Sequence, residues 1–197
     1  MKTLTCNISL DDITANIALL LKENSALFAE RTVFRQKNVE GIYVGILWKD
    51  FYQNIRNIAA NLRKAGFEKG DKMMLFSSNC LEMLQMELAV MASGGVAVPI
   101  FSNFKKETAE LLVKHSDAEW ITIEGEQQLN QLSQDLGLRK VYSIYPVQNQ
   151  NVYHLADFSE LLVENTDNVL DTDISPDTIC LNMFTSGTMG VPKCVQL

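Results

Sequence analysis

Short apolar runs alternate with longer amphipathic segments along most of this chain, and that alternation restricts the folds open to it. Apolar runs at 73–76, 96–100, 120–123, 140–144 and 179–184 have the length of buried strands. Apolar residues at helical spacing predict helices between them, at about 81–91, 105–115 and 129–136. Strand–helix–strand order requires crossover connections. We therefore predict an α/β fold with a mostly parallel sheet flanked by helices on both faces.

The N-terminal part departs from this pattern. An opening helix is predicted by four apolar residues that share one face: Ile13, Ile17, Leu20 and Leu21. Residues 32–34 and 42–47 predict a small β-hairpin near the N-terminus, around a polar turn at Gly41. The most regularly amphipathic helix follows at 48–62, and Gly66 is expected to stop it.

Polar residues and glycines mark the other predicted boundaries. Ser77, Ser78 and Asn79 are candidate N-caps for the helix at 81–91, and Gly94 with Gly95 is expected to end it. A short helix is predicted at 158–162. An acidic linker at 167–177 then leads to the last strand.

The distribution of charge excludes several classes of partner. Residues 1–116 carry 14 Lys or Arg and 12 Asp or Glu, whereas residues 117–197 carry 3 and 12, which gives the whole chain a net charge of −7. No Lys or Arg lies between Lys140 and Lys193. Binding to nucleic acid or to an anionic membrane surface needs clustered cations, so neither is expected.

Targeting signals and cysteine spacing indicate a compartment. Asp11 and Asp12 interrupt the region where a signal peptide would have its apolar core, and no run approaches the ~20 apolar residues of a transmembrane segment. The four cysteines are widely scattered: Cys6, Cys80, Cys180 and Cys194. Neither a disulfide framework nor a zinc site has such spacing, so we expect a cytoplasmic protein.

One loop, at 185–193, has residues suited to binding a ligand. After the strand that ends at Phe184, the chain reads Thr185-Ser186-Gly187-Thr188-Met189-Gly190-Val191-Pro192-Lys193. Two glycines free the backbone to turn its amides toward one point, three hydroxyls add donors, and a lysine adds positive charge. These are the components of a phosphate cradle, although an ordinary polar turn remains an equal alternative. The glycine spacing is not that of a Walker A loop.

This loop resembles the signature of adenylate-forming enzymes, the family of acyl-CoA synthetases, luciferases and peptide-synthetase adenylation domains. That signature reads Thr-Ser-Gly-Thr-Thr-Gly-x-Pro-Lys-Gly, and the chain departs from it at Met189 and Cys194. Further similar segments occur in family order: Gly70-Asp71, Asn79, Gly94-Gly95-Val96-Ala97-Val98-Pro99 and Ser175-Pro176-Asp177. Residues 15–27 resemble the opening helix of the long-chain fatty acid–CoA ligases.

The resemblance implies a reaction and a set of site residues. Such enzymes join a carboxylic acid to ATP, release pyrophosphate, and pass the acyl group to coenzyme A. By analogy, the ATP phosphates would be bound by Thr185, Ser186, Gly187, Thr188, Gly190 and Lys193, with Thr188 also near Mg²⁺. Met189 removes a hydroxyl and Cys194 adds a side chain, and either change would weaken phosphate binding.

The resemblance also implies that 1–197 is the N-terminal part of an AMP-binding domain. The family's adenine-, ribose- and magnesium-binding motifs follow this loop, as does its C-terminal domain with a catalytic lysine. We therefore expect no catalytic residue within 1–197 and no activity from it alone, while the parent protein would be a ligase for a long-chain fatty acid. The alternative is a degenerate, non-catalytic binding module that keeps the fold.

Other residues have simpler interpretations. His115 and His154 are expected to be solvated. The methionines at 73, 74, 83, 86 and 91 fit a core better than an acyl tunnel. Phe101 and Phe104 follow a strand end, where they would either line a ligand cleft or form a helix staple.

Overall fold

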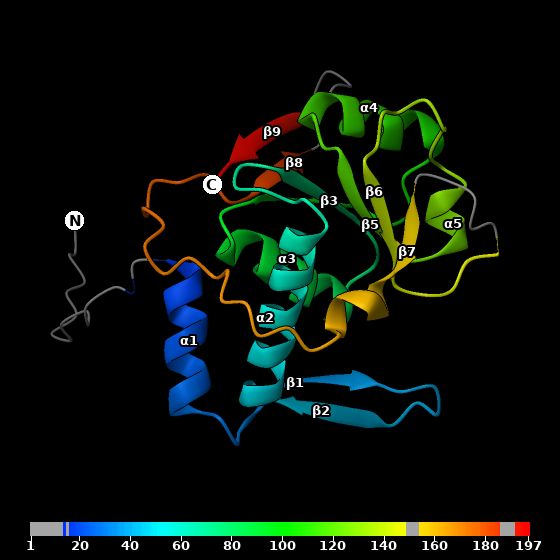
Figure 1. Cartoon of the computed structure of the whole chain (residues 1–197). Helices are drawn as coiled ribbons and strands as arrows, with labels where there is room; N and C mark the ends of the chain where they lie inside the picture. The colour runs from blue at the N-terminus through cyan, green and yellow to red at the C-terminus, as the bar shows by residue number, and fades with distance from the viewer. Residues whose placement is uncertain (1–13, 15, 149–153, 186–191) are drawn as a thin grey trace, which may run out of the picture.

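A five-stranded parallel sheet lies at the centre of the computed structural model, which describes residues 14, 16–148, 154–185 and 192–197. The spatial order of its strands is β4-β3-β5-β6-β7 (Figure 1). The strands are β3 (Lys72–Phe76), β4 (Val96–Ile100), β5 (Trp120–Ile123), β6 (Lys140–Ser143) and β7 (Leu155–Asp157). The first four match predicted strands, whereas β7 was not predicted.

Helices cover both faces of this sheet, as predicted. The crossovers contain α3 (Leu81–Ala92), α4 (Lys106–Ser116) and the single-turn α5 (Glu126–Leu129). Met73 and Leu75 of β3 pack in a core cluster with residues of α2 and α3, while Met74 and Phe76 pack in a second cluster with residues of α4. Alternate residues of one strand thus enter different cores, which is why such strands read as continuous apolar runs.

The predicted N-terminal elements are confirmed. The chain begins with α1 (Ile17–Leu27), then β1 (Thr32–Lys37) and β2 (Tyr43–Leu47) pair as an antiparallel hairpin before α2 (Trp48–Lys64). The hairpin extends away from the central sheet, beneath α2 and α3 in Figure 1. Ile13, predicted for the first helix, lies outside the described residues.

Glycines end α2 and α3 as predicted, through the same pattern of hydrogen bonds. Gly66 has a φ of +99°. Its N–H donates to the carbonyl of Arg63, and the N–H of Phe67 donates to that of Leu62, both at 3.0 Å. Gly94, with a φ of +83°, ends α3 in the same way. This left-handed cap satisfies carbonyls that a helix end would otherwise leave unpaired.

The predicted helix at 129–136 is wrong, because α5 ends at Leu129. Leu132 and Leu138 are nevertheless buried in the second core cluster. The N–H of Ser133 donates to the Glu110 carboxylate of α4 at 2.9 Å, so it is not available to a helical ladder. Apolar spacing therefore predicted the burial of this segment correctly and its backbone conformation incorrectly.

The predicted N-caps of α3 are wrong, although the helix begins at Leu81 as predicted. Its N-cap is Cys80, whose sulfur accepts from the N–H of Met83 at 3.5 Å. The N–H of Leu81 donates to Oε1 of Gln36, on β1, at 2.6 Å. A side chain 45 positions away in sequence thus helps to start the helix.

The last predicted strand belongs mainly to a different sheet. β8 (Asn182–Thr185) pairs antiparallel with β9 (Lys193–Gln196), which was not predicted. An isolated parallel bridge between Ala97 and Leu181 connects this segment to β4. The short helix predicted at 158–162 is present as the 3₁₀ helix η1 (Phe158–Leu162).

Three further observations on the described residues bear on the sequence analysis. None of the helices in the described ranges is both long and apolar enough to cross a bilayer. Cys80, Cys180 and Cys194 are free thiols. Met73, Met74 and Met86 are fully buried, which confirms that they pack in the core.

Candidate functional site

A cavity of about 390 Å³ opens at the carboxyl edge of the parallel sheet, where β3 and β4 end. The residues that line it come from four segments: Ser77, Ser78, Asn79, Met83, Pro99, Ile100, Phe101, Ser102, Phe104, Met183 and Phe184. In open α/β sheets, ligands bind outside the carboxyl ends of the strands. This cavity is therefore the candidate functional site.

Aromatic and apolar side chains form one wall of the cavity. The rings of Phe101 and Phe104 meet edge to face, with centroids 5.4 Å apart. Both line the cavity, which is one of the two alternatives given by the sequence, and Phe101 remains 68% exposed. The loop that carries them is held by α5, because Nε2 of Gln128 donates to the Ser102 carbonyl at 3.0 Å. Such a wall suits the apolar part of a ligand.

Polar groups face the aromatic wall from the segment between β3 and α3. The Ser78 N–H donates to the Glu124 carboxylate at 3.0 Å, and the Ser77 hydroxyl donates to the Ser78 carbonyl. Asn79 is exposed beside the first turn of α3. Burial raises the pKa of the Cys80 thiol to about 11, so this N-cap is uncharged at neutral pH.

The two ends of the predicted phosphate loop meet beside this cavity. Thr185, the last residue of β8, pairs with Lys193, the first residue of β9, and the Thr185 hydroxyl donates to the Lys193 carbonyl at 3.4 Å. Lys193 is exposed. Ser186, Gly187, Thr188, Met189 and Gly190 lie outside the described residues, so their arrangement stays a prediction.

The sequence analysis did not single out the residues of β8 that line the cavity. Met183 and Phe184 of β8 bring the strand that precedes the loop into the cavity wall. The ring of Phe184 also contacts that of His115, with centroids 5.7 Å apart. Phe184 is the last apolar residue before the loop, and this position could have indicated that it lies near the site.

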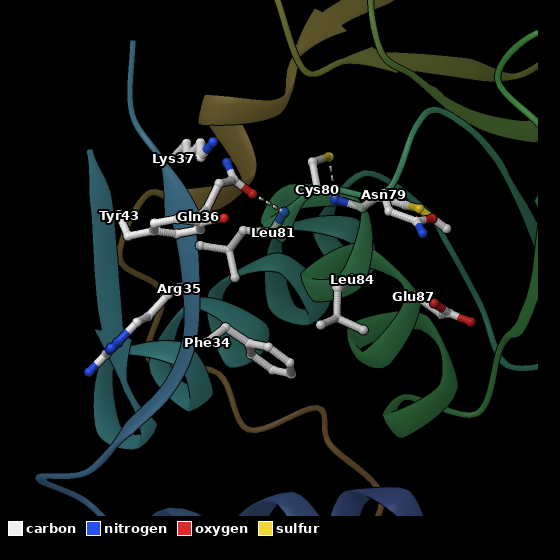
Figure 2. Close-up of a pocket in the computed structure, with 11 residues that line it drawn as sticks. Phe34, Arg35, Gln36, Lys37, Tyr43, Asn79, Cys80, Leu81, Leu84 and Glu87 are labelled. Carbon is white, nitrogen blue, oxygen red and sulfur yellow. Dashed lines mark hydrogen bonds between the residues drawn. The ribbon is translucent and has the colours of Figure 1, made fainter. Parts of the chain in front are cut away.

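A second cavity, also of about 390 Å³, lies between the hairpin and α3 (Figure 2). Gln36 reaches across from β1 to the start of α3, and Phe34 and Leu84 face the cavity from opposite sides. Burial raises the pKa of Glu87, which also lines it. Asn79 and Met83 line both cavities, so the two lie on either side of the first turn of α3.

Metal-binding groups do not gather in the described part of the chain. Within it, no set of three or more His, Cys, Asp or Glu side chains is placed to hold a metal ion. Mg²⁺ is usually held by one or two carboxylates together with substrate phosphates. Thr188, predicted near Mg²⁺, lies outside the described residues.

Comparison with known proteins decides the family. The family model for the AMP-binding enzyme matches residues 21–197. The chain belongs to this family. The predicted resemblance is thereby confirmed, and the match spans the parallel sheet, the cavity at its carboxyl edge and the hairpin around the loop.

Individual members of the AMP-binding family agree with this assignment. The chain is 29% identical over 169 residues to fatty acyl-CoA synthetase A of Dictyostelium discoideum, covering 80% of the chain and 25% of that protein. It is 26% identical over 162 residues to the long-chain-fatty-acid–CoA ligase ACSBG1 of Rattus norvegicus, covering 77% and 22%. The chain thus spans about a quarter of the length of these relatives.

A solved structure supports the same fold. The acetoacetyl-CoA synthetase of Streptomyces lividans superposes with a TM-score of 0.81 at 18% identity, covering 92% of this chain and 30% of that one. At such identity the likeness shows the fold alone. It confirms the α/β architecture predicted from the sequence.

Proposed function

We propose that residues 1–197 form the N-terminal part of the AMP-binding domain of an acid–thiol ligase. The rest of that domain and a C-terminal domain would belong to the longer protein. The ligase would activate a carboxylic acid with ATP and transfer the acyl group to coenzyme A. The family match and the length of the acyl-CoA synthetases that resemble the chain support this proposal.

One observation carries the proposal. The β8–β9 hairpin pairs Thr185 with Lys193, which brings the two ends of the signature loop together. β8 follows a segment that runs parallel to β4, so the hairpin leads toward the carboxyl edge of the sheet. The cavity at that edge includes Met183 and Phe184, the residues just before Thr185. A phosphate loop held here would lie beside a cavity suited to an acid.

In the proposed first half-reaction, the residues of the signature loop would bind the phosphates of ATP. A carboxylate oxygen attacks the α-phosphorus of ATP, the bond from that phosphorus to the β-phosphate oxygen breaks, and pyrophosphate leaves with the negative charge. Backbone amides at Ser186, Gly187, Thr188 and Gly190 would bind the β- and γ-phosphates, together with the hydroxyl of Thr185. Lys193 would add a point charge that stabilises the departing pyrophosphate.

The second half-reaction transfers the acyl group. The thiol of coenzyme A attacks the acyl carbonyl, a thioester bond forms, and AMP leaves. Mg²⁺ bound with ATP would neutralise phosphate charge, and Thr188 would lie near this ion. We propose a long-chain fatty acid as the substrate, because the fatty acyl-CoA ligases above resemble the chain, and the cytoplasm as the location.

The decisive experiment is acid-dependent exchange of labelled pyrophosphate into ATP, with a panel of fatty, short-chain and aryl acids. The longer protein should catalyse exchange, and a preference for long-chain acids would support that substrate. The 197-residue chain alone should not, because it lacks the family's later adenine and ribose motifs. Exchange by the short chain would refute the proposed need for those motifs.

Met189 and Cys194 favour a second candidate, a non-catalytic binding module. Cys194 is half-buried on β9, opposite Phe184. It stands where the family signature has glycine, and Met189 stands where the signature has threonine. Absence of exchange with every acid, in a longer protein that still binds ATP in calorimetry, would support this alternative over the ligase.

Lys193 is the residue to test first. In the longer protein, Lys193→Ala is expected to lower the adenylation rate about 10²–10³-fold, the usual effect of losing one group that stabilises charge in the transition state. Lys114→Ala removes an exposed lysine of α4 and serves as the control. An unchanged rate with a large rise in KM for the acid would remove Lys193 from the phosphate site.

A further inference from the structure

A third cavity has a volume of about 340 Å³. It is enclosed by α1, α2 and the segment at 168–172, and its lining residues are Lys22, Tyr52, Arg56, Asn168, Leu170 and Thr172. Its volume falls at the lower end of the ~300–1,000 Å³ typical of small-molecule sites. None of its lining residues lines the cavity at the carboxyl edge.

Charge distinguishes this cavity from the rest of the surface. Lys22 of α1 and Arg56 of α2 both line it, and no carboxylate does. Among the ion pairs within 4.0 Å found in the described ranges, none includes Lys22 or Arg56. In a chain with 24 Asp or Glu and 17 Lys or Arg, two cations that line one cavity and form no ion pair with a described acidic residue leave a positive site.

Neutral donors complete the lining. Tyr52 lies one turn before Arg56 on the same face of α2, because residues four apart are neighbours on a helix. Burial raises the pKa of the Tyr52 phenol, while the charge of Arg56 acts in the opposite direction. The phenol therefore keeps its proton at neutral pH and can donate. The Asn168 amide and the Thr172 hydroxyl are further donors in the lining.

Contacts with α1, with the end of α3 and with the core hold the wall at 168–172. Asn16, the N-cap of α1, donates through Nδ2 to the carbonyls of Thr172 and Ile174, at 2.8 and 3.0 Å. The Asp171 N–H donates to the Ala92 carbonyl at 2.9 Å, and the Asp171 carboxylate forms an ion pair with Lys69. Leu170 is 8% exposed and anchors the segment in the core.

Asparagines of α2 fix the chain just before this wall. Asn57 donates to the Leu162 carbonyl at 3.1 Å. Asn61 donates to the carbonyls of Leu161 and Val163, at 3.0 and 2.8 Å. Asn165 donates back to Oδ1 of Asn61 at 3.0 Å. The cavity walls are thus held before any ligand arrives, which lowers the entropy cost of binding.

We propose that this cavity binds a phosphate group of a small molecule, through the Arg56 guanidinium, the Lys22 ammonium and the Tyr52 hydroxyl. Two cations and three neutral donors match a dianion with at least three oxygens better than a carboxylate, which has two. The site is separate from Lys193 and does not depend on the proposed ligase activity. It gives the chain a second phosphate-binding site.

The test is isothermal titration calorimetry of the 197-residue chain at constant ionic strength. Pyrophosphate, inorganic phosphate and ATP are the three probes, with acetate as the carboxylate control. Binding of pyrophosphate or phosphate without ATP would indicate a site for a free anion, whereas binding of ATP would indicate a site for a nucleotide. Arg56→Gln is expected to weaken binding about tenfold or more, because hydrogen bonds to charged groups contribute about 1.5–3 kcal/mol and 1.4 kcal/mol is tenfold.

Matched variants make the test specific. Lys64→Gln removes one positive charge from the same helix, outside the cavity, and should leave the dissociation constant within twofold. Tyr52→Phe keeps the ring and should weaken binding severalfold. Circular dichroism melts establish that each variant folds. The shift of the Arg56 Nε–H signal on adding pyrophosphate, measured by NMR on the unaltered chain, gives a readout that needs no variant.

Three results would overturn the proposal. One is no heat with any phosphate probe at millimolar concentration and no shift at Arg56. Another is equal weakening by Lys64→Gln and Arg56→Gln, which would indicate only general attraction to a positive surface. The third is binding lost in Lys193→Gln but intact in Arg56→Gln, which would assign the anion to the signature loop.

Discussion

Replacing Gly95 by alanine is expected to destabilise the chain, because the new methyl group has no room. A Cβ at this position would lie 2.6 and 2.8 Å from Cε1 and Cζ of Phe67, and 3.0 Å from Cγ1 of Val90. Phe67 is 2% exposed, and its ring packs edge to face on Trp120 with centroids 5.4 Å apart. The ring therefore cannot move aside without disturbing a second aromatic side chain.

The magnitude follows from two opposing effects. Overpacking a core costs about 1–3 kcal/mol. Replacing glycine by alanine also restricts the unfolded chain, which stabilises the fold by about 0.4–1 kcal/mol. The net loss should be about 1–2 kcal/mol, and at about 2–4 °C per kcal/mol for a chain of this length, Tm should fall by about 2–8 °C.

Urea denaturation followed by circular dichroism measures this loss. Gly125→Ala is the control, since its Cβ would meet only the Cβ of Tyr145, at an ordinary 3.7 Å. In the double variant with Phe67→Leu, the overlapping ring atoms are gone, so the penalty of Gly95→Ala should largely disappear. A Gly95→Ala variant as stable as the parent, or a penalty that persists without the Phe67 ring, would refute the reasoning.

The remaining predictions concern Asn16 and Cys80. Asn16→Ala should lower the free energy of unfolding by about 2–3 kcal/mol, since it removes an N-cap and two hydrogen bonds to the 168–174 segment. Asn16→Ser keeps the cap acceptor and should lose less; equal losses in urea melts would contradict this. Burial raises the pKa of the Cys80 thiol from its ordinary value of 9.0 to about 11 in the fold. Above pH 9 the unfolded chain binds fewer protons at this thiol, so stability should fall as the pH rises from 9 to 11. Cys80→Ser should make that fall smaller, and an identical pH profile in the variant would show that Cys80 does not cause it.

The parallel sheet could be predicted because its signal is local. Residues 73–76 are an uninterrupted apolar run, and residues 120–123 contain one polar residue, Thr122. Such runs identify strands that are buried on both faces. Gly66 and Gly94 could be assigned because a left-handed cap favours glycine whatever surrounds it. The signature loop could be recognised from its residues, although its conformation lies outside the described part of the chain.

What the sequence did not predict depends on contacts between distant residues. The first turn of α3 is capped by Cys80 rather than by Ser77, Ser78 or Asn79, and Gln36 of the hairpin accepts the N–H of Leu81. The helix expected at 129–136 is shortened where Glu110 accepts the N–H of Ser133. In both places a side chain from another element accepts a backbone N–H, and no local pattern reveals such a contact. β9 was missed because a strand of four residues after the loop, Lys193–Gln196, has too little apolar pattern to identify it.

The asparagine contacts between α2 and the segment at 161–165 have a consequence for solution conditions. Every donor and acceptor among them is a neutral amide or a peptide group. Protonation does not alter them and dissolved ions do not screen them, unlike the exposed pair of Lys69 and Asp171. In mild acid or concentrated salt, the chain leading into the Arg56 cavity should therefore stay attached to α2 after ion pairs at the surface have weakened.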